Sequence, residues 1–206
     1  MKSPSKLLVT ILNQGYIRPE LADVQHNLLT DTRAEVTVKH LNIRPSENAR
    51  NHSVKLMLDG GYDYLLTIDH DTVPLRNPID LIALNLDVVG FAVPQWNISD
   101  PDYPIYFVGM DKADGGYTEH KEKDWLQEVD AVGSGCLLLS RKVLEAVEEP
   151  FVRKWKEGFA VTGLDFYFCE KAKEKGFKVY CHYDYVADHH KELSLLSVLD
   201  FKHGGS

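Results

Sequence analysis

Three short apolar runs alternate with segments of helical periodicity over the first third of this chain, and no other feature constrains the fold as strongly. The runs have the length and composition of buried strands and lie at residues 6–12, 35–41 and 64–68. Pro19 begins the first intervening segment, whose apolar residues recur at helical spacing. Ser46 is a suitable N-cap for the second, which Gly60 and Gly61 end. This β-α-β-α-β order predicts an α/β fold with a mostly parallel central sheet and helices on both faces, a three-layer α/β/α sandwich.

The rest of the chain continues this alternation with one interruption. Further strands are expected at 87–93, 125–131, 136–139 and 177–183, and helices at 77–84, 141–147 and 166–175. Between 94 and 124 the periodicity is lost, which predicts a long, partly mobile loop with at most one strand, at 106–108. The sequence contains no internal repeat, linker or low-complexity tract, so we expect a single domain over residues 1–206.

Two carboxylates follow the third apolar run. Asp69 and Asp71, on either side of His70, lie at the carboxyl end of a predicted buried strand, where ligands bind in open α/β sheets. Carboxylates at this spacing can share one Mg²⁺ or Mn²⁺ whose remaining positions take diphosphate oxygens. A second Asp-x-Asp, Asp100 and Asp102, lies in a proline-rich stretch without a preceding strand and is expected to be a solvated turn. The first pair therefore marks the candidate site, with a simple strand-end turn as the alternative.

The same residues also fit the motif of a different enzyme class. Residues 68–73, Ile-Asp-His-Asp-Thr-Val, match the nucleophile motif of haloacid-dehalogenase-type phosphatases, in which Asp69 would attack phosphate. In those enzymes the motif usually follows the first strand of the domain, whereas two predicted strands and two predicted helices precede it here. No later acidic pair stands in the expected metal-binding setting. The phosphatase is therefore the weaker hypothesis.

Composition bears on the class of partner. The net charge is −8 with histidine counted as neutral, which opposes binding to a bare phosphate backbone, so a nucleic-acid acceptor is disfavoured. No apolar run approaches the roughly 18 residues of a membrane-spanning helix, so no transmembrane segment is expected. The three cysteines, Cys136, Cys169 and Cys181, form no C-x-x-C pair, and a reduced, cytoplasmic protein is the simplest interpretation. A homo-oligomer is compatible with these features.

Four segments of the chain, in order, resemble a glycosyltransferase of the GT-A fold. The likeness is to the family 2-like kind found in short, single-domain bacterial and phage proteins, and it runs through nearly the whole chain. The segments are the first strand with its following loop, the second helix with the run into the Asp pair, the glycine turn, and the late acidic segment with its helix and strand, at residues 9–20, 49–71, 132–141 and 162–179. None is decisive alone, but all four stand in the family's order.

The resemblance implies a metal-dependent transfer of a sugar from a nucleotide-diphosphate sugar to an acceptor hydroxyl. A UDP-sugar is favoured as donor, a GDP-sugar is the second choice, and Mn²⁺ or Mg²⁺ would be the cofactor. The resemblance further implies that Thr10 and Asn13 line the base and ribose pocket and that Arg50 reaches the nucleotide. An exposed helix surface is the alternative for Arg50. The acceptor and the stereochemistry of transfer are not implied.

The resemblance also assigns the reacting groups. Asp69 and Asp71 would hold ribose and metal, with Asp71 the more direct metal ligand. His189 or His190 would complete the metal shell from the carboxyl-terminal side. Asp165 would be the general base or a close contact of the acceptor. The structural alternatives are solvated histidines and, for Asp165, a carboxylate that stabilises the dipole of its helix.

One position departs from the family pattern. The acidic pair before the late helix is usually Glu-Asp, and here it is Leu164-Asp165. The carboxylate that matches the base is kept and the first one is lost. The departure leaves open a third hypothesis, a protein on the same fold that binds sugar nucleotides without turnover. Gly133 and Gly135, in the glycine turn, either permit a tight turn or bring the backbone close to a sugar.

The expected loop at 94–124 is a candidate lid on the acceptor side. Loops of this length without secondary structure are often functional, and transfer needs water kept away from the donor. Gly115 and Gly116 would provide hinge freedom, and Trp96, Tyr103 or Tyr106 a face on which a sugar could stack. A static surface segment is the alternative.

Overall fold

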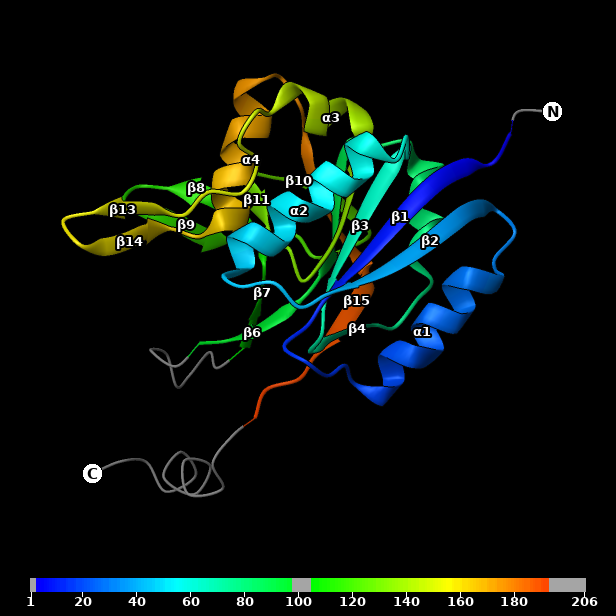
Figure 1. Cartoon of the computed structure of the whole chain (residues 1–206). Coiled ribbons are helices and arrows are strands. Elements are labelled where there is room, and N and C mark those ends of the chain that lie inside the picture. The colour runs from blue at the N-terminus through cyan, green and yellow to red at the C-terminus, as the bar shows by residue number, and fades with distance from the viewer. Residues whose placement is uncertain (1–2, 98–104, 193–206) are drawn as a thin grey trace.

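The computed structural model describes residues 3–97 and 105–192, and its elements follow the predicted alternation through the first three strands (Figure 1). The helices are α1 Pro19–Thr30, α2 Ser46–Asp59, α3 Arg141–Ala146 and α4 Leu164–Glu174, with a 3₁₀ helix, η1, at Pro78–Leu84. α2 begins at Ser46 after Pro45, so Ser46 is the first helical residue and not the predicted cap. Asp100, Asp102 and Tyr103 lie outside the described residues.

Eight strands form the central sheet. They are β1 Ser5–Leu12, β2 Ala34–Leu41, β3 Tyr64–Asp69, β4 Thr72–Pro74, β5 Val88–Ala92, β10 Leu126–Val129, β12 Cys136–Ser140 and β15 Val179–His189. Their order is β10-β15-β5-β12-β3-β1-β2, and β4 pairs with β15. β1 is parallel to both β2 and β3, β15 is parallel to β5, and β12 is antiparallel to both β3 and β5, so β1, β2, β3, β5 and β15 all run in one direction. The predicted mostly parallel sheet is confirmed, with β12 inserted between its two parallel parts.

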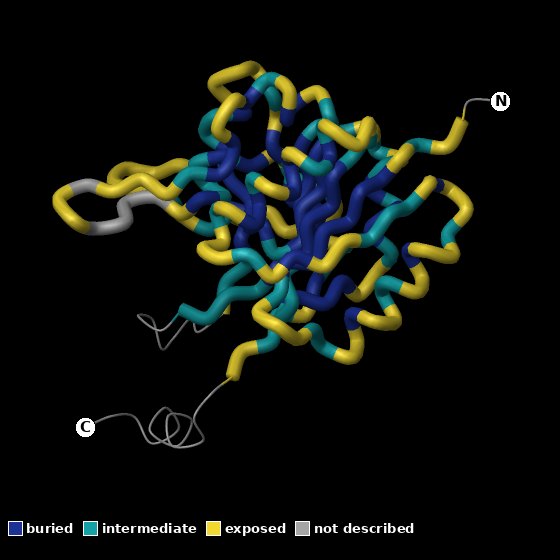
Figure 2. The backbone as a smooth tube through the Cα atoms, viewed as in Figure 1, coloured by how far each residue is buried: buried dark blue, intermediate teal, exposed yellow. Residues whose placement is uncertain are grey.

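Helices cover both faces of this sheet, because alternate residues of a strand point to opposite faces. On one face, Leu7, Val9 and Ile11 of β1 join a hydrophobic core with α1 and η1. On the other face, Leu8 joins a larger core with α2, α3 and α4. Figure 2 shows the buried strands between layers that are partly exposed. The three-layer arrangement is therefore confirmed as well.

The segment at 94–124 differs from its prediction. Its described part forms short strands, namely β6 Pro94–Trp96 paired with β7 Ile105–Phe107, and β8 Gly109–Ala113 paired with β9 Gly116–Glu119 and with β11 Ala131–Val132. A further two-stranded sheet, β13 Lys154–Lys156 with β14 Phe159–Thr162, projects from the body (Figure 1). The prediction of a long loop was wrong because strands of three to five residues carry too few alternations to show a period.

The expected hinge at Gly115 and Gly116 is a hairpin turn. Ala113 pairs with Gly116, so Asp114 and Gly115 form the two-residue connection between β8 and β9. Gly115, the second residue of the connection, has a φ of 82°, in the left-handed region that glycine adopts readily. Asp114-Gly115 is a common sequence signal for a hairpin turn, whereas Gly115 and Gly116 were interpreted from the sequence as a flexible hinge. Because β8 and β9 are paired, the described part of this segment gives no support to the lid hypothesis.

β15 is longer than the strand predicted at 177–183. It runs to His189 because it changes partners: its first half pairs with β10 and β5, and Ala187, Asp188 and His189 pair with β4. Asp184 and Asp188 therefore lie within this strand. This extension carries His189 to the edge of the sheet where β3 and β4 meet.

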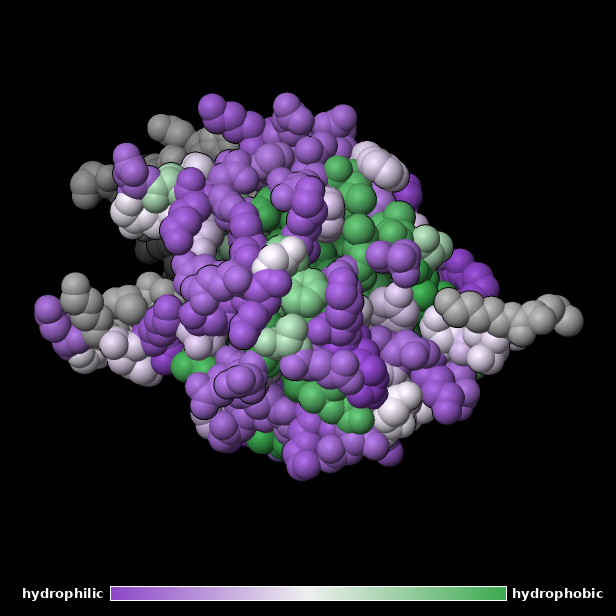
Figure 3. Space-filling model, turned by 90° about the horizontal axis from the view of Figure 1, so that it is seen from above, coloured by the Kyte–Doolittle hydropathy of each residue, from purple (hydrophilic) through white to green (hydrophobic). Residues whose placement is uncertain are grey.

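Hydrophilic side chains cover most of the face seen from above, with smaller hydrophobic areas between them (Figure 3). Cys136, Cys169 and Cys181 are all buried and free. In residues 3–97 and 105–192, no helix combines the length and the apolar character needed to cross a bilayer.

Candidate active site

A cavity of about 600 Å³ opens at the carboxyl ends of β1, β2 and β3. It is lined by Leu12, Asn13, Gln14, Leu41, Ile43, Arg44, Pro45, Ser46, Ala49, Arg50, Asp69, His70 and Asp71. We call it the strand-end cavity. Leu12, Leu41 and Ile43 give it an apolar wall, while α2 directs its amino-terminal end toward it. The structure thus brings Asn13, Arg50, Asp69 and Asp71 together on the lining of one cavity.

Asn13 and Thr10 occupy different environments. The Asn13 backbone N–H donates to the Leu41 carbonyl at 2.9 Å, and its Oδ1 accepts from Gly15 N at 3.0 Å, which shapes the loop after β1. Thr10 is fully buried within β1 and is absent from the cavity lining. Its Oγ1 has no hydrogen-bond partner in the described chain. The resemblance implied that Thr10 lines the pocket. Thr10 instead packs within the sheet and does not reach the cavity.

Arg50 holds Asp69. Its Nη2 donates to Asp69 Oδ1 at 2.8 Å and to Oδ2 at 2.9 Å, and its Nη1 donates to the Ser134 carbonyl at 3.3 Å. The arginine side chain is 5% exposed and that of Asp69 is 30% exposed. Burial raises the pKa of the Asp69 carboxyl, and the Arg50 charge opposes that rise. Arg50 was expected to reach a nucleotide; it lines the strand-end cavity, and within the protein its two Nη groups are directed at Asp69 and at the glycine turn.

Asp71 lies between two nitrogen groups from the carboxyl-terminal segment. His189 Nε2 and Lys191 Nζ are both 3.4 Å from Asp71 Oδ2. Burial raises the pKa of this carboxyl, but the hydrogen bond from His189 and the charges of Lys191 and His189 outweigh that effect, so the net shift is downward. Asp71 is therefore ionised at neutral pH.

The two histidines point in different directions, as alternation along an extended chain requires. His189 Nδ1 lies 2.8 Å from the Pro94 carbonyl, which can only accept, so Nδ1 donates to it, and this contact orients Nε2 toward Asp71 Oδ2 at 3.4 Å. His190 Nε2 lies 3.3 Å from Asp188 Oδ2 instead. The geometry favours His189 over His190 as a partner of Asp71.

A smaller cavity of about 170 Å³ adjoins the first and shares Asp69 and Asp71 with it. Its other lining residues are Thr72, Val93, Gln95, Val108, Gly133, Ser134, Gly135, Asp165, His189 and Lys191. We call it the inner cavity. Asp165 is the second residue of α4, and its Oδ2 lies 3.4 Å from Ser134 N and 3.5 Å from Ser134 Oγ. Asp165, from α4, and Asp71, from the link between β3 and β4, thus both line the inner cavity.

The two glycines of the turn lie in close packing with their neighbours. A Cβ at Gly133 would lie 3.1 Å from Val108 Cβ, and one at Gly135 would lie 3.1 Å from Thr72 Oγ1. Neither glycine has a positive φ. The Gly135 carbonyl accepts from Asp69 N at 2.9 Å, which ties the turn to the end of β3. Gly133 and Gly135 therefore let the turn lie between Asp69 and Asp165.

Ser134, Gln95 and Lys191 were missed as site residues by the sequence reading. Ser134 stood inside a turn that had been singled out for its glycines, and Lys191 stood next to the candidate histidines. Within the described ranges, no group of three or more His, Cys, Asp or Glu side chains is gathered closely enough to hold a metal ion by itself. Asp71 and His189 provide two donors, so a metal bound here needs further ligands from elsewhere.

Comparison with known proteins supports the fold. No family model matches the chain, and no curated protein matches it. Among solved structures, A197 from STIV superposes with a TM-score of 0.61 at 19% identity, covering 91% of this chain and 86% of that one. GalNAc-T7, crystallised with UDP, GalNAc and Mn²⁺, superposes with a TM-score of 0.51 at 11% identity, covering 93% of this chain and 44% of that one.

This chain therefore spans less than half of the GalNAc-T7 chain that it resembles. At these identities the likeness bears on the fold and not on the activity. Together with the sheet order and the two helical layers, it shows that this chain has a GT-A-like α/β fold.

Proposed function

We propose that this protein is a metal-dependent glycosyltransferase of the hexosyltransferase class, which moves a sugar from a nucleotide-diphosphate sugar to an acceptor hydroxyl. The observation that carries the proposal is the meeting of two cavities at Asp69 and Asp71. The larger has room for a nucleotide, and the smaller, with Asp165 on its wall, has room for the reacting groups. A UDP-sugar is the favoured donor and a GDP-sugar the second choice.

The strand-end cavity is suited to a nucleoside. Its apolar wall of Leu12, Leu41 and Ile43 offers contact to a base, while Asn13 and Arg44 offer polar groups at its border. GalNAc-T7, which shares the fold, was crystallised with UDP. The amino-terminal end of α2, with its positive dipole end, favours an anionic group on this side of the cavity.

Asp69 would bind the ribose hydroxyls. Both of its oxygens already accept from Arg50, yet each retains a further lone pair. Arg50 thus fixes the carboxylate orientation before a ligand arrives, which lowers the entropic cost of binding. The same contacts make Asp69 a weaker candidate than Asp71 for direct metal ligation.

Asp71 and His189 would hold Mn²⁺ or Mg²⁺. A carboxylate oxygen and a histidine nitrogen are both acceptable to Mn²⁺, and the pair faces one another at 3.4 Å. Ions of this class usually take one or two protein carboxylates and complete their shell with substrate phosphates and water, so two protein donors suffice. When bound, the metal would offset negative charge on the departing diphosphate.

Asp165 would deprotonate the acceptor hydroxyl if transfer inverts the anomeric centre. Ser134 N and Oγ lie close to its Oδ2, which holds the carboxylate at the wall of the inner cavity. Leu164 is 7% exposed and packs in the core between α4 and the sheet. The glutamate that the family usually has would have to be accommodated there, so its loss leaves Asp165 as the acidic group available to the site.

The rival functions make different use of these residues. A phosphatase of the haloacid-dehalogenase type needs Asp69 as a nucleophile, whereas both Asp69 oxygens are engaged by Arg50. A sugar-nucleotide-binding protein without turnover needs the strand-end cavity but no base at Asp165.

A thermal-shift panel of UDP-, GDP-, CMP- and dTDP-sugars, each with and without Mn²⁺, tests the proposal. We expect one donor class to raise Tm, and more so with Mn²⁺. Slow donor hydrolysis by the purified protein would then separate an enzyme from a silent binder. Accumulation of an aspartyl-phosphate at Asp69 would instead support the phosphatase, and no response to any nucleotide sugar would refute the proposal.

A further inference from the structure

We infer that the outer edge of β2 is the self-association surface of this protein and that it pairs antiparallel with β2 of a second copy, about a two-fold axis at Thr37. The inference rests on the backbone and charge pattern of one strand. It does not depend on the proposed transferase activity.

β2 is the last strand on its side of the central sheet. It pairs with β1 from Ala34 to Leu41, and in the described chain no strand pairs with its other edge (Figure 1). The strand has eight residues and contains no proline. A regular edge strand of this length offers a row of N–H and C=O groups to another strand, and proteins usually shorten, bend or cover such edges.

The outward backbone groups belong to the even-numbered residues. The Leu41 carbonyl accepts from Asn13 N, so it points toward β1. Because peptide groups alternate between the two edges of a strand, the odd-numbered residues of β2 face β1. Ala34, Val36, Val38 and His40 therefore present their backbone groups to the free edge.

Two unpaired charges lie on this strand. Glu35 and Lys39 are both exposed. Neither side chain forms an ion pair or a hydrogen bond with any residue in the described part of the chain. Four residues of extended strand separate them by roughly 13 Å, too far for the two side chains of one copy to pair with each other.

A two-fold axis at Thr37 satisfies both charges. Residues 35–39 read Glu-Val-Thr-Val-Lys, which is symmetric about its centre except that the charges at its ends are opposite. In the antiparallel pair, Glu35 lies opposite Lys39 of the second copy, and Lys39 lies opposite Glu35 of that copy. Val36 and Val38 meet as hydrogen-bonded neighbours, and the two Thr37 side chains meet at the axis.

Alternative registers are less favourable. The alternation of outward groups allows only shifts of the axis that keep even-numbered residues opposite one another. Moving it by one residue, to Val36 or Val38, separates both charge pairs. Moving it by two residues places Glu35 opposite Glu35, or Lys39 opposite Lys39. The strand therefore specifies one register by attraction and excludes others by repulsion.

The same geometry leaves both strand-end cavities open. They lie at the carboxyl ends of β1, β2 and β3, and an antiparallel pair directs the carboxyl ends of the two β2 strands away from each other. Association is thus compatible with ligand binding and independent of it.

Sedimentation velocity of the full chain over a wide concentration range gives the test. Wild type is expected to pass from a 23.4 kDa monomer to a dimer of twice that mass as concentration rises. Glu35→Lys and Lys39→Glu should each raise the dimer Kd by at least about tenfold, because like charges then face each other twice. The double variant should dimerise like wild type, and Glu122→Lys, an exposed charge change away from β2, should have no effect.

Mixing the two single variants makes the test sharper. Each alone is expected to be monomeric, yet an equimolar mixture should form a heterodimer, because its cross-strand pairs are again of opposite charge. Amide hydrogen exchange at Val36 and Val38 should slow with concentration in wild type only. A monomeric wild type at every concentration, a dimer insensitive to both single variants, or a mixture that stays monomeric would each overturn the inference.

Discussion

Arg50 donates from one nitrogen to both carboxylate oxygens of Asp69, at 2.8 and 2.9 Å, from a side chain that is almost fully buried. The two aspartates of the Asp-x-Asp motif therefore have different partners in the ligand-free protein. Asp69 is held by α2, whereas Asp71 faces His189 and Lys191 at 3.4 Å. This difference leads to separate expectations for each side chain.

Arg50→Met is expected to lower the free energy of unfolding by roughly 2–3 kcal/mol, because it leaves the Asp69 charge partly buried without a partner. Asp69→Asn in the same background should recover part of that loss, which a double-mutant cycle by chemical denaturation measures. Lys55→Met serves as the control on the same helix, since its pair with Asp59 is exposed and should change stability by less than about 0.5 kcal/mol. Additive losses in the cycle would contradict the coupling.

Asp71→Asn is expected to abolish the Mn²⁺-dependent part of donor binding while leaving the fold intact. The amide keeps the shape of the carboxylate but loses the charge that a metal requires. Isothermal titration with donor, in the presence and absence of Mn²⁺, measures the effect. Asp100→Asn and Asp102→Asn, in the other Asp-x-Asp, are the controls and should bind as wild type. Unchanged Mn²⁺ dependence in a folded Asp71→Asn protein would remove Asp71 from the metal site.

Lys191→Met is expected to raise the affinity for Mn²⁺, measured with UDP present, by about threefold to tenfold. Lys191 Nζ lies 3.4 Å from Asp71 Oδ2, so its charge opposes a second cation at the same oxygen, although the partial exposure of the lysine limits the effect. Lys178→Met, which removes a lysine paired with Glu128 away from the site, is the matched control. A fall in affinity would mean that Lys191 binds the diphosphate and does not compete with the metal.

Asp165→Asn is expected to retain donor and metal binding and to lose transfer by about 10²-fold or more, as removal of a general base does. Ser134→Ala should cause a smaller loss, because it removes one of the two groups near Asp165 Oδ2. A purely structural carboxylate at the start of α4 would behave differently, lowering stability by about 1 kcal/mol with turnover nearly unchanged. Tm and transfer rate measured on one sample distinguish the two roles.

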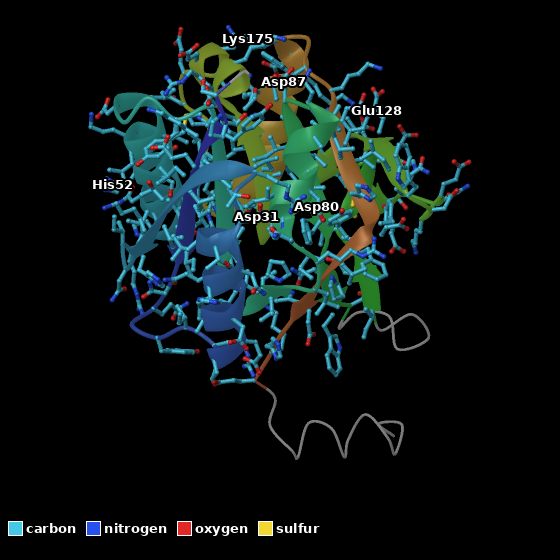
Figure 4. All side chains as sticks on the ribbon, turned by 90° about the vertical axis from the view of Figure 1, so that its right-hand side faces the viewer. Asp31, His52, Asp80, Asp87, Glu128 and Lys175 are labelled. Atoms are coloured by element: carbon cyan, nitrogen blue, oxygen red, sulfur yellow. The ribbon has the colours of Figure 1, made fainter. Side chains whose placement is uncertain are left out.

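Acid stability should depend on Asp31. The hydrogen bonds from the Arg33 side chain and backbone, with a further one from Asn77, lower the pKa of Asp31 to about 2. Arg33 also pairs with Asp80, so this cluster joins the end of α1 to η1 (Figure 4). A carboxyl whose pKa is lowered on folding stabilises the protein above its unfolded pKa of about 4, and this stabilisation is lost as the pH falls toward 2.

Asp31→Asn should therefore lower Tm near neutral pH, and its difference from wild type should shrink in buffers below pH 4. Asp23→Asn, an exposed change on the same helix, should show little difference at either pH. A Tm difference for Asp31→Asn that stays constant down to pH 3 would show that the ion pair is not responsible.

Local pattern was sufficient for much of the fold. The apolar runs that became β1, β2 and β3, and the spacing of apolar residues in α1 and α2, identified the first half of the sheet because strand and helix periods are set by neighbouring residues. The same pattern was insufficient for β6, β8 and β9. β6 pairs with β7, and β8 pairs with β9 and with β11, which the chain reaches only later.

The sequence by itself determined that Asp69 and Asp71 stand at the carboxyl end of a buried strand, since both the run and its end are local features. Only the tertiary structure decided what surrounds them. Lys191 is 120 residues from Asp71, and it arrives there with His189 because the end of β15 pairs with β4. Arg50 likewise reaches Asp69 from α2, 19 residues earlier in the chain. Contacts of this kind depend on how the strands are ordered in the sheet. That order results from burying two hydrophobic cores at once, which involves residues from the whole chain and cannot be read from a short stretch of sequence.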